Sequence, residues 1–301
     1  MNKQAERSKG IISVLVASIL WGTTGVAATF APTMSPLAIG SIAMGVGGLL
    51  QALIAIKIIH SERQKIYKNK HLLLIGAFCV AVYPLAFYAS MRYAGVTIGT
   101  VISIGSAPLL SALIEYFYDE KSVITKRWGC GAALGILGMI LLCLSETIHL
   151  NEASNHIVLG VVLGLLAGFT YALYSWAARK IMQNGVASRA AMGAIFGGGG
   201  ILLIPVMLIT GTTLFSSWNN VAVGIYMAII PMFLGYLFYG YGLARIPASM
   251  ATTITLTEPV VAAILAVVIV GERLSLFGWS GVAFIIISLI IITMPSHTAR
   301  K

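Results

Sequence analysis

Ten apolar runs recur along the chain, separated by short clusters of charged residues. A helix of about 20 residues spans the hydrocarbon core of a bilayer, and each run has roughly that length. Strands of a membrane barrel would be about 10 residues long and would alternate strictly in polarity, which these runs do not. The pattern therefore predicts an all-α membrane protein with ten transmembrane helices. The runs cover residues 11–30, 36–59, 71–91, 97–118, 126–146, 157–181, 188–210, 221–243, 248–270 and 275–294.

The composition agrees with a chain embedded in lipid. Of the 301 residues, 58% are apolar and only 9% are charged, whereas soluble domains have about 25% charged residues. The formal net charge of +10 would by itself suggest a nucleic-acid partner. The basic residues are instead explained by membrane topology, so the expected partners are the lipid bilayer and a small-molecule substrate, and no nucleic acid.

The basic residues predict the orientation of the chain. With the N-terminus in the cytoplasm, all but two of the 19 Lys and Arg residues fall on the inner side, and only Arg92 and Arg245 fall outside. Such an excess on one side is the positive-inside pattern. It predicts that both termini are cytoplasmic and that the number of spans is even.

The chain contains an internal duplication. It predicts two five-helix repeats, residues 1–150 and 151–301. Because five is odd, the second repeat enters the membrane from the opposite side, so the repeats are inverted. Inverted repeats are the architecture of many secondary carriers, whose substrate site lies near the bilayer midplane. A shift of 151 residues aligns, without a gap, Phe87 with Phe238, Tyr88 with Tyr239, Pro108 with Pro259, Ala112 with Ala263, and Trp128 with Trp279.

Several of these segments resemble a known family. The stretch ASILWGTTGVAATF, the block FYASMRYAGVTIGTVISIGSAPLLSAL and the segment LTEPVVAAILAVVIVGERLS are similar to the EamA-type drug/metabolite transporter (DMT) superfamily, and the similarity covers nearly the whole chain. The resemblance implies ten helices around a central cavity lined by spans 1, 3, 4, 6, 8 and 9. It also implies export of amino acids, other metabolites or toxic compounds. One departure is Ala107, which stands where the second repeat has Glu258, so a mechanism that needs an acid in each half is not supported.

Glu258 is the leading functional candidate. An ionisable residue within a span costs at least about 2.5 kcal/mol to insert, and it tends to face a cavity or a partner. Its carboxyl could exchange a proton in each cycle and couple export to the proton gradient, or it could bind a substrate ammonium. Alternatively, it could accept hydrogen bonds from backbone groups freed where Pro259 interrupts the helix. The sequence leaves these roles open.

Two prolines and a group of hydroxyls occupy the matching fourth and ninth spans. Pro108 and Pro259 each remove a backbone donor and predict interrupted helices at equivalent places, which is typical of a transporter binding site; a simple packing kink is the alternative. The hydroxyls recur at helical spacing and could contact a polar ligand, or else bond between helices. The hydroxyl candidates are Ser103, Ser106, Thr252 and Thr255.

Aromatic side chains form the third group of candidates. Tyrosine combines apolar area with a hydroxyl, which suits an amphipathic metabolite. Ordinary helix packing is the alternative for each of them. The candidates lie in spans that the resemblance places around the cavity: Trp21, Tyr83, Tyr88, Tyr171, Tyr174, Tyr236 and Tyr239.

A second carboxyl, Glu115, lies one turn from the predicted cytoplasmic end of the fourth span, close to Asp119 and Lys121. We interpret it as an interfacial residue. The glycine row Gly160, Gly164 and Gly168 in the sixth span predicts a close helix contact.

No catalytic motif is present in the sequence. The five histidines lie in loops or at span ends, and there is no HExxH motif, Cys/His cluster or phosphate-binding loop, so we expect no enzyme, metal or cofactor. We predict a multi-pass carrier of the bacterial inner or plasma membrane that exports a small metabolite by alternating access. Amino acids or related compounds are the leading substrates, and protons are the candidate coupling ion. An exporter of toxic or drug-like compounds and a passive channel are the alternatives, and monomer and homodimer both stay open.

Overall fold

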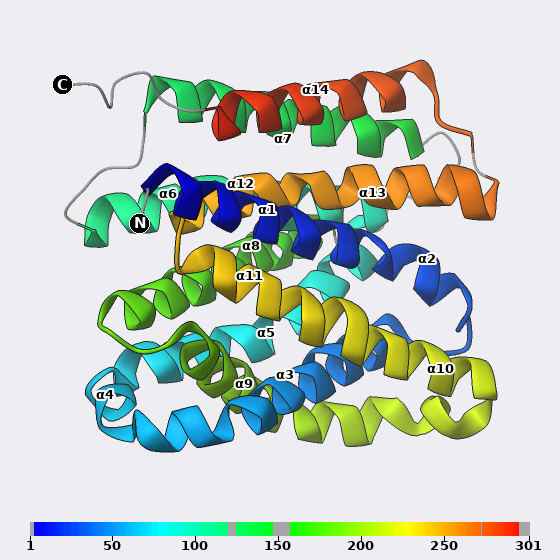
Figure 1. Ribbon diagram of the computed structural model, residues 1–301. Coiled ribbons are helices and arrows are strands. Elements are labelled where there is room, and N and C mark those ends of the chain that lie inside the picture. The colour runs from blue at the N-terminus through cyan, green and yellow to red at the C-terminus, as the bar shows by residue number, and fades with distance from the viewer. Residues whose placement is uncertain (1–2, 120–124, 147–156, 272, 295–301) are drawn as a thin grey trace.

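The computed structural model of the protein describes residues 3–119, 125–146, 157–271 and 273–294. All regular secondary structure within these ranges is helical (Figure 1). The first half contains α1 (Lys3–Gly22), α2 (Thr24–Thr29), α3 (Pro36–Ser61), α4 (Arg63–Lys68), α5 (Lys70–Ala94), α6 (Val96–Tyr118) and α7 (Lys126–Glu146).

The second half has more irregular helices. Two of its elements are π-helical, η3 and η5, and two are 3-10 helices, η2 and η4. Its elements are α8 (Ile157–Gln183), α9 (Ser188–Thr210), η2 (Gly211–Ser216), α10 (Trp218–Met227), η3 (Ala228–Leu234), α11 (Gly235–Leu243), α12 (Ala248–Ile254), η4 (Thr255–Thr257), α13 (Glu258–Leu265), η5 (Ala266–Val270) and α14 (Leu276–Thr293).

Side-chain caps start several of these helices. The Ser35 hydroxyl accepts a hydrogen bond from the amide of Ala38 at 3.1 Å, and Pro36 follows at the first helical position of α3, where its missing N–H costs nothing. Ser217 and Ser275 cap α10 and α14 in the same way. The helix starts are therefore encoded locally.

Nine helical segments of the described chain are long and apolar enough to cross a membrane. They correspond to nine of the ten predicted runs, and most of their boundaries agree with the predicted ones to within a few residues. The remaining run, 126–146, forms α7, which packs along α14. The nine segments are Gln4–Thr29, Pro36–Ser61, Lys70–Ala94, Ile98–Tyr118, Ile157–Gln183, Ser188–Ser216, Trp218–Leu243, Ala248–Ile269 and Leu276–Thr293.

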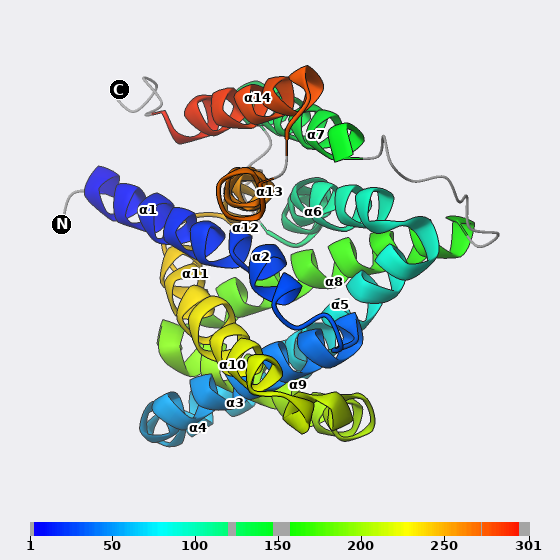
Figure 2. The ribbon, with the colours of Figure 1, turned by 90° about the vertical axis from the view of Figure 1, so that its right-hand side faces the viewer.

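The helices of the two halves pack against each other in reciprocal pairs. Helix α3 packs on α9 and α7 packs on α14, while the contact of α5 with α8 is matched by that of α11 with α1. Two similar halves related by a two-fold axis would give this pairing. The α7–α14 pair forms an outer layer, separated from the rest of the bundle by α6, α12 and α13 (Figures 1 and 2).

Close helix contacts depend on glycine. A Cβ atom on Gly48 of α3 would meet the backbone of Phe196 in α9, and one on Gly200 would lie 2.7 Å from the carbonyl oxygen of Gly45. The predicted glycine row of α8 is also a contact surface, because a Cβ on Gly164 would lie 2.8 Å from the hydroxyl oxygen of Ser90. Small residues allow this approach, which supplies the dispersion contacts that hold helices together in lipid.

The two ends of the bundle differ in charge. We call the end at which α1 begins the basal end, and the opposite end, where α2 lies, the α2 end (Figure 1). The basal end carries the basic helix α4, the start of α7 with Lys126 and Arg127, and the end of α8 with Arg179 and Lys180. The clustering at one end agrees with the predicted positive-inside pattern.

The position of Arg245 corrects the predicted topology. Its Nε donates a hydrogen bond to the Glu6 carboxylate at 2.9 Å, so Arg245 lies at the basal end and not, as the sequence analysis has it, on the outer side. Arg273, assigned there to the inner side, follows η5 at the α2 end (Figure 1). Since each predicted repeat has an odd number of spans, Arg92 and Arg245, which lie two positions apart under the shift of 151, fall at opposite ends. The exchange leaves the basic excess at one end unchanged.

The glycine contact between α3 and α9 leads to a stability prediction. Gly48→Ala should lower the free energy of unfolding by about 1–3 kcal/mol, because the added methyl group forces the two backbones apart. Gly129→Ala is the matched control: a Cβ there meets nothing within 4 Å, so better helix propensity should raise stability by up to about 1 kcal/mol. Thermal unfolding in detergent measures both, and equal shifts would contradict the role of Gly48.

Candidate functional site

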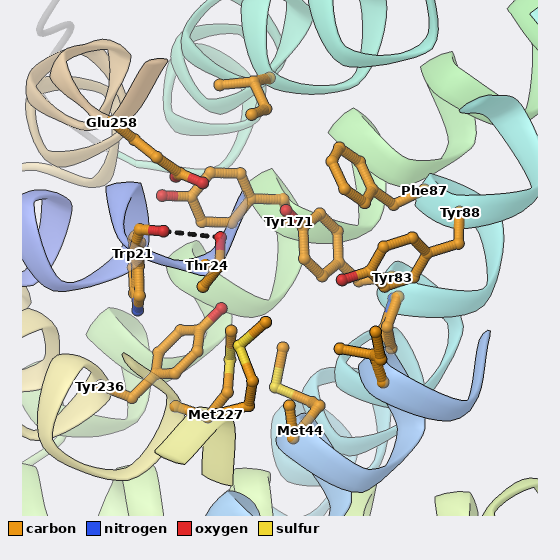
Figure 3. A pocket seen from close by; sticks show the side chains of 16 residues that line it. Trp21, Thr24, Met44, Tyr83, Phe87, Tyr88, Tyr171, Met227, Tyr236 and Glu258 are labelled. Atoms are coloured by element: carbon orange, nitrogen blue, oxygen red, sulfur yellow. Dashed lines mark hydrogen bonds between the residues drawn. The ribbon is translucent and has the colours of Figure 1, made fainter. Parts of the chain in front are cut away.

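A chamber lies at the centre of the bundle and is lined by both halves of the chain (Figure 3). It encloses about 60 Å³ and is bounded by α1, α2, α3, α5, α6, α8, α13 and the helix that runs from α10 through η3 to α11. The side chains labelled in Figure 3 are Trp21, Thr24, Met44, Tyr83, Phe87, Tyr88, Tyr171, Met227, Tyr236 and Glu258.

A larger cavity, which we call the vestibule, adjoins the chamber. Its volume is about 450 Å³, and it shares Trp21, Tyr88 and Glu258 with the chamber. The vestibule continues along α2 and the start of α3, where Thr29 and Pro36 line it, and therefore extends toward the α2 end. Glu258 stands where the two cavities meet.

The Glu258 carboxyl is placed by an irregular stretch of the ninth span. The 3-10 turn η4 precedes it and Pro259 follows it at the start of α13. Gly22 of α1 allows the two helices to approach closely, since a Cβ there would lie 2.8 Å from the carbonyl oxygen of Glu258. Within the described residues, the Glu258 carboxyl has no hydrogen bond or ion pair. The alternative in which it accepts bonds from freed backbone groups is therefore not observed there.

Trp21 joins the aromatic wall to an irregular part of the eighth span. Its Nε1 donates a hydrogen bond to the carbonyl oxygen of Pro231 at 2.9 Å, within the π-helix η3. Its ring lies 4.7 Å from that of Tyr236, centroid to centroid, and 5% of its surface is exposed. Thr24 turns back onto the same residue, with its hydroxyl donating to the Trp21 carbonyl oxygen at 2.7 Å (Figure 3). The indole is thus held rigidly between α1 and η3.

The structure divides the seven aromatic candidates into two groups. Tyr174 and Tyr239 lie behind the chamber wall, where they bond to the Tyr236 hydroxyl at 2.8 Å and the Ser175 hydroxyl at 2.9 Å. The Tyr171 hydroxyl is also engaged, with Thr255 at 3.0 Å. The five that line the chamber are Trp21, Tyr83, Tyr88, Tyr171 and Tyr236.

The hydroxyl candidates mostly serve helix packing. Ser103 and Ser106 are not among the residues that line the chamber or the vestibule, and their hydroxyls have no hydrogen-bond partner within the described residues. A Cβ on Gly168 would meet both residues, so they lie at the α6–α8 contact. The Thr252 hydroxyl bonds back to the carbonyl oxygen of Ala248 at 2.9 Å. Thr255 is the candidate with a hydrogen bond to a chamber residue, Tyr171, within the described chain.

The two prolines behave differently. Pro259 begins α13 after a 3-10 turn, as an interrupted helix requires. Pro108 lies inside α6, which continues without a break, so the expected interruption in the fourth span is wrong. A proline removes a single backbone donor, and a helix packed among neighbours tolerates that loss without ending.

The third helix contributes residues that the sequence analysis missed. Ile39, Gly40 and Met44 of α3 line the chamber, although the resemblance does not implicate the second span. The Tyr88 ring packs directly on Gly40, where a Cβ would overlap it. Gly40 is one of several glycines in a largely apolar run, so the sequence alone does not distinguish it.

Glu115 corrects a further prediction. It is 1% exposed, so it is not an interfacial residue. Its carboxylate accepts hydrogen bonds from the amides of Ala248 at 2.6 Å and Ser249 at 3.2 Å, and from the Ser249 hydroxyl. It therefore caps the N-terminus of α12, where a negative charge is favourable, from the opposite half of the chain.

Arg179 forms hydrogen bonds at the basal end, near Glu115. Its Nη1 donates to the carbonyl oxygen of Leu243 at 2.7 Å and to that of Ile246. Between this pair of bonds and the chamber, residues such as Tyr174 and Tyr239 are fully buried. The bonds of Glu115 and Arg179 form what we call the basal seal. The chamber is thus continuous with a cavity toward the α2 end and packed solid toward the basal end.

Both cavities lack a basic side chain. Neither the chamber nor the vestibule is lined by Lys, Arg or His within the described residues. Glu258 is their single charged group. In the same part of the chain, no group of three or more His, Cys, Asp and Glu side chains is placed to hold a metal ion.

The fold and the chamber define a multi-pass membrane protein with a central cavity between two helical halves. Residues 8–144 and 158–294 each match the model of the EamA-like transporter family. The chain belongs to this family, which confirms the predicted resemblance, and it is a membrane transporter.

Similar proteins carry transporter names. The chain is 31% identical to the uncharacterized transporter YwfM of Bacillus subtilis over 93% of this chain and 92% of the relative. It is 25% identical to the threonine/homoserine exporter RhtA of Escherichia coli, covering 88% of this chain and 84% of that protein. A solved crystal structure superposes with a TM-score of 0.79 at 15% identity, over 94% of this chain and 96% of the other, which shows that the fold is shared. These names indicate a transporter rather than an enzyme.

The basal seal leads to a second stability prediction. Glu115→Ala should lower the free energy of unfolding by about 1–3 kcal/mol, because it leaves two buried amides without an acceptor. Glu62 offers the matched control: its carboxylate accepts from the amide of Ala187 at 2.8 Å and pairs with Lys65 at 3.3 Å, but at a partly exposed position at the surface. Glu62→Ala should cost less than about 1 kcal/mol, since water replaces the lost acceptor. Equal losses in thermal unfolding would argue against a buried cap at Glu115.

Proposed function

We propose that the protein is a secondary transporter that exports a small metabolite by alternating access. The observation that carries this proposal is the chamber between the two halves, continuous with a vestibule at one end and sealed at the other. A carrier binds its substrate at such a site and exposes it to one side at a time. A passive channel would need a path that is open at both ends.

The basic residues support an orientation for this transporter. The basal end is cytoplasmic in the proposal, because it carries most of the Lys and Arg residues. Both described chain ends, in α1 and α14, lie there too. The vestibule then faces the outside, so the structure corresponds to an outward-facing state with ten spans in two inverted repeats, residues 1–150 and 151–301.

Amino acids or related compounds are the leading substrate class. The support is the similarity to a protein named as a threonine/homoserine exporter, together with a chamber that combines aromatic rings, hydroxyls and one carboxyl. Glu258 is the proposed coupling or binding acid. Its carboxyl has no protein partner within the described residues, so a proton or a substrate cation can occupy it.

The first test is counterflow in proteoliposomes with labelled amino acids and nucleobases, with and without an imposed pH gradient. A carrier should show saturable counterflow, and the gradient should drive accumulation by the wild type but not by Glu258→Gln, which cannot release a proton. Glu62→Gln, at a partly exposed carboxyl outside the chamber, should behave as the wild type. If Glu258→Gln keeps gradient-driven transport, the acid does not couple transport to protons. Flux without counterflow would indicate a channel.

A further inference from the structure

The charged groups around the chamber restrict the charge of a suitable substrate, which membership of the transporter family alone does not. Glu258 is the single charged side chain in the lining of the chamber and the vestibule, as far as the structure describes them. Its carboxyl has no ion pair or hydrogen bond there. A charged carboxylate in such a place requires a compensating cation. A substrate that brings one positive charge supplies it.

An amino acid would also bring a carboxylate, and the site offers little to bind it. In many transporters the N-terminus of a broken helix binds a substrate carboxylate through free amides. Here the Glu258 amide is bonded to the carbonyl oxygen of Thr255, and Pro259 has no amide hydrogen. The first two positions of α13 therefore offer no free amide to an anion.

The chamber hydroxyls do not replace the missing cation. Those of Tyr171 and Tyr236 are already bonded to Thr255 and Tyr174. The hydroxyls of Tyr83 and Tyr88, which have no hydrogen bond within the described residues, are donors but carry no charge. A substrate carboxylate would thus lie in the same cavity as the Glu258 carboxylate. The substrate's own ammonium would be the single positive group available to the two carboxylates.

The aromatic wall favours a cation with an apolar body. Tyr83 and Tyr171 lie with their ring centroids 5.6 Å apart, and Trp21 closes the wall on the side of Glu258 (Figure 3). A cation within about 6 Å of an aromatic face is attracted by the ring. Met44 and Met227 line the same chamber with flexible apolar side chains that adapt to the body of a ligand.

We propose that the chamber binds an organic monocation that lacks a carboxylate, namely an amine with an aromatic or aliphatic body, in preference to the corresponding amino acid. The proposal rests on the transporter function, and among the amino-acid-related compounds it favours the amines over the amino acids themselves. Glu258 binds the ammonium group, and Trp21 with the tyrosine rings surrounds the apolar part.

Matched pairs that differ only in the carboxylate test this proposal. Purified wild-type protein in proteoliposomes is assayed for counterflow of labelled tyramine against tyrosine, and of phenethylamine against phenylalanine. We expect the amine of each pair to exchange at least about ten times faster at equal concentration, because the carboxylate of the amino acid would lose water without gaining a positive partner, which costs about a factor of ten or more in affinity. This comparison uses the wild type alone and so does not depend on how a variant folds.

Variants then assign the preference to the chamber. Glu258→Gln should remove the preference for the amine, while Glu62→Gln should keep it. Trp21→Leu should weaken amine exchange, and Trp218→Leu, at a residue that is 87% exposed, should not. Thermal unfolding without ligand checks that each variant is folded.

The outcomes separate this proposal from the transporter assignment. Faster or equal exchange of the amino acids overturns the monocation proposal and leaves the transporter standing. Absence of amine exchange in both pairs also overturns it, and the broader panel of amino acids and nucleobases then decides whether the protein transports at all. An amine preference that survives in Glu258→Gln would show that the carboxyl is not its cause.

Discussion

Within a bilayer, every backbone polar group has to find its partner inside the protein, because lipid offers none. Regular helices meet this requirement by themselves, and the irregular places of this structure meet it with side chains. Trp21 bonds to the carbonyl group of Pro231 in η3, Arg179 bonds to that of Leu243 at the end of α11, and Glu115 accepts the amides at the start of α12. The same irregular places border the chamber and the basal seal, so the groups that complete the backbone also position the site.

The two halves are similar in sequence but differ where the chemistry lies. Under the shift of 151 residues, Glu258 corresponds to Ala107 and Glu115 to Ala266. Ala107 is fully buried among apolar neighbours, whereas Glu258 faces both cavities. The duplication therefore supplies the scaffold, and single substitutions in one half supply the charged group of the chamber and the seal of one end.

Local properties of the sequence predicted most of the fold. Apolar runs and serine caps are encoded in neighbouring residues, which is why the spans were found to within a few residues at most boundaries. Contacts between distant parts of the chain were not predictable in this way. Glu115 bonds to residues more than 130 positions away, and no local pattern distinguishes it from an interfacial acid.

The candidate site was predicted only in part, for a related reason. Most aromatic candidates do line the chamber, because a polar or aromatic side chain inside a span stands out. Met44 does not stand out among the many apolar residues of α3, and Ser106 stands out but lies against α8. The misplacement of Arg245 has a different origin. An odd number of spans per repeat reverses the side on which corresponding residues lie, and that step depends on counting spans rather than on the residue itself.

A basal seal built from Glu115 and Arg179 also fits a transporter better than an apolar seal would. In alternating access this end has to open, and polar groups that lose their partners there gain water, which offsets much of the cost of separating them. An apolar seal would instead expose its surface to water at each opening. At the α2 end, Ala266 replaces the carboxyl and Ile98 stands where the basal end has Ser249, so the two ends differ in the interaction that closes them. The hydrogen bonds of Glu115 and Arg179 are found at the closed basal end, and the cavity extends toward the end where the equivalent carboxyl is missing.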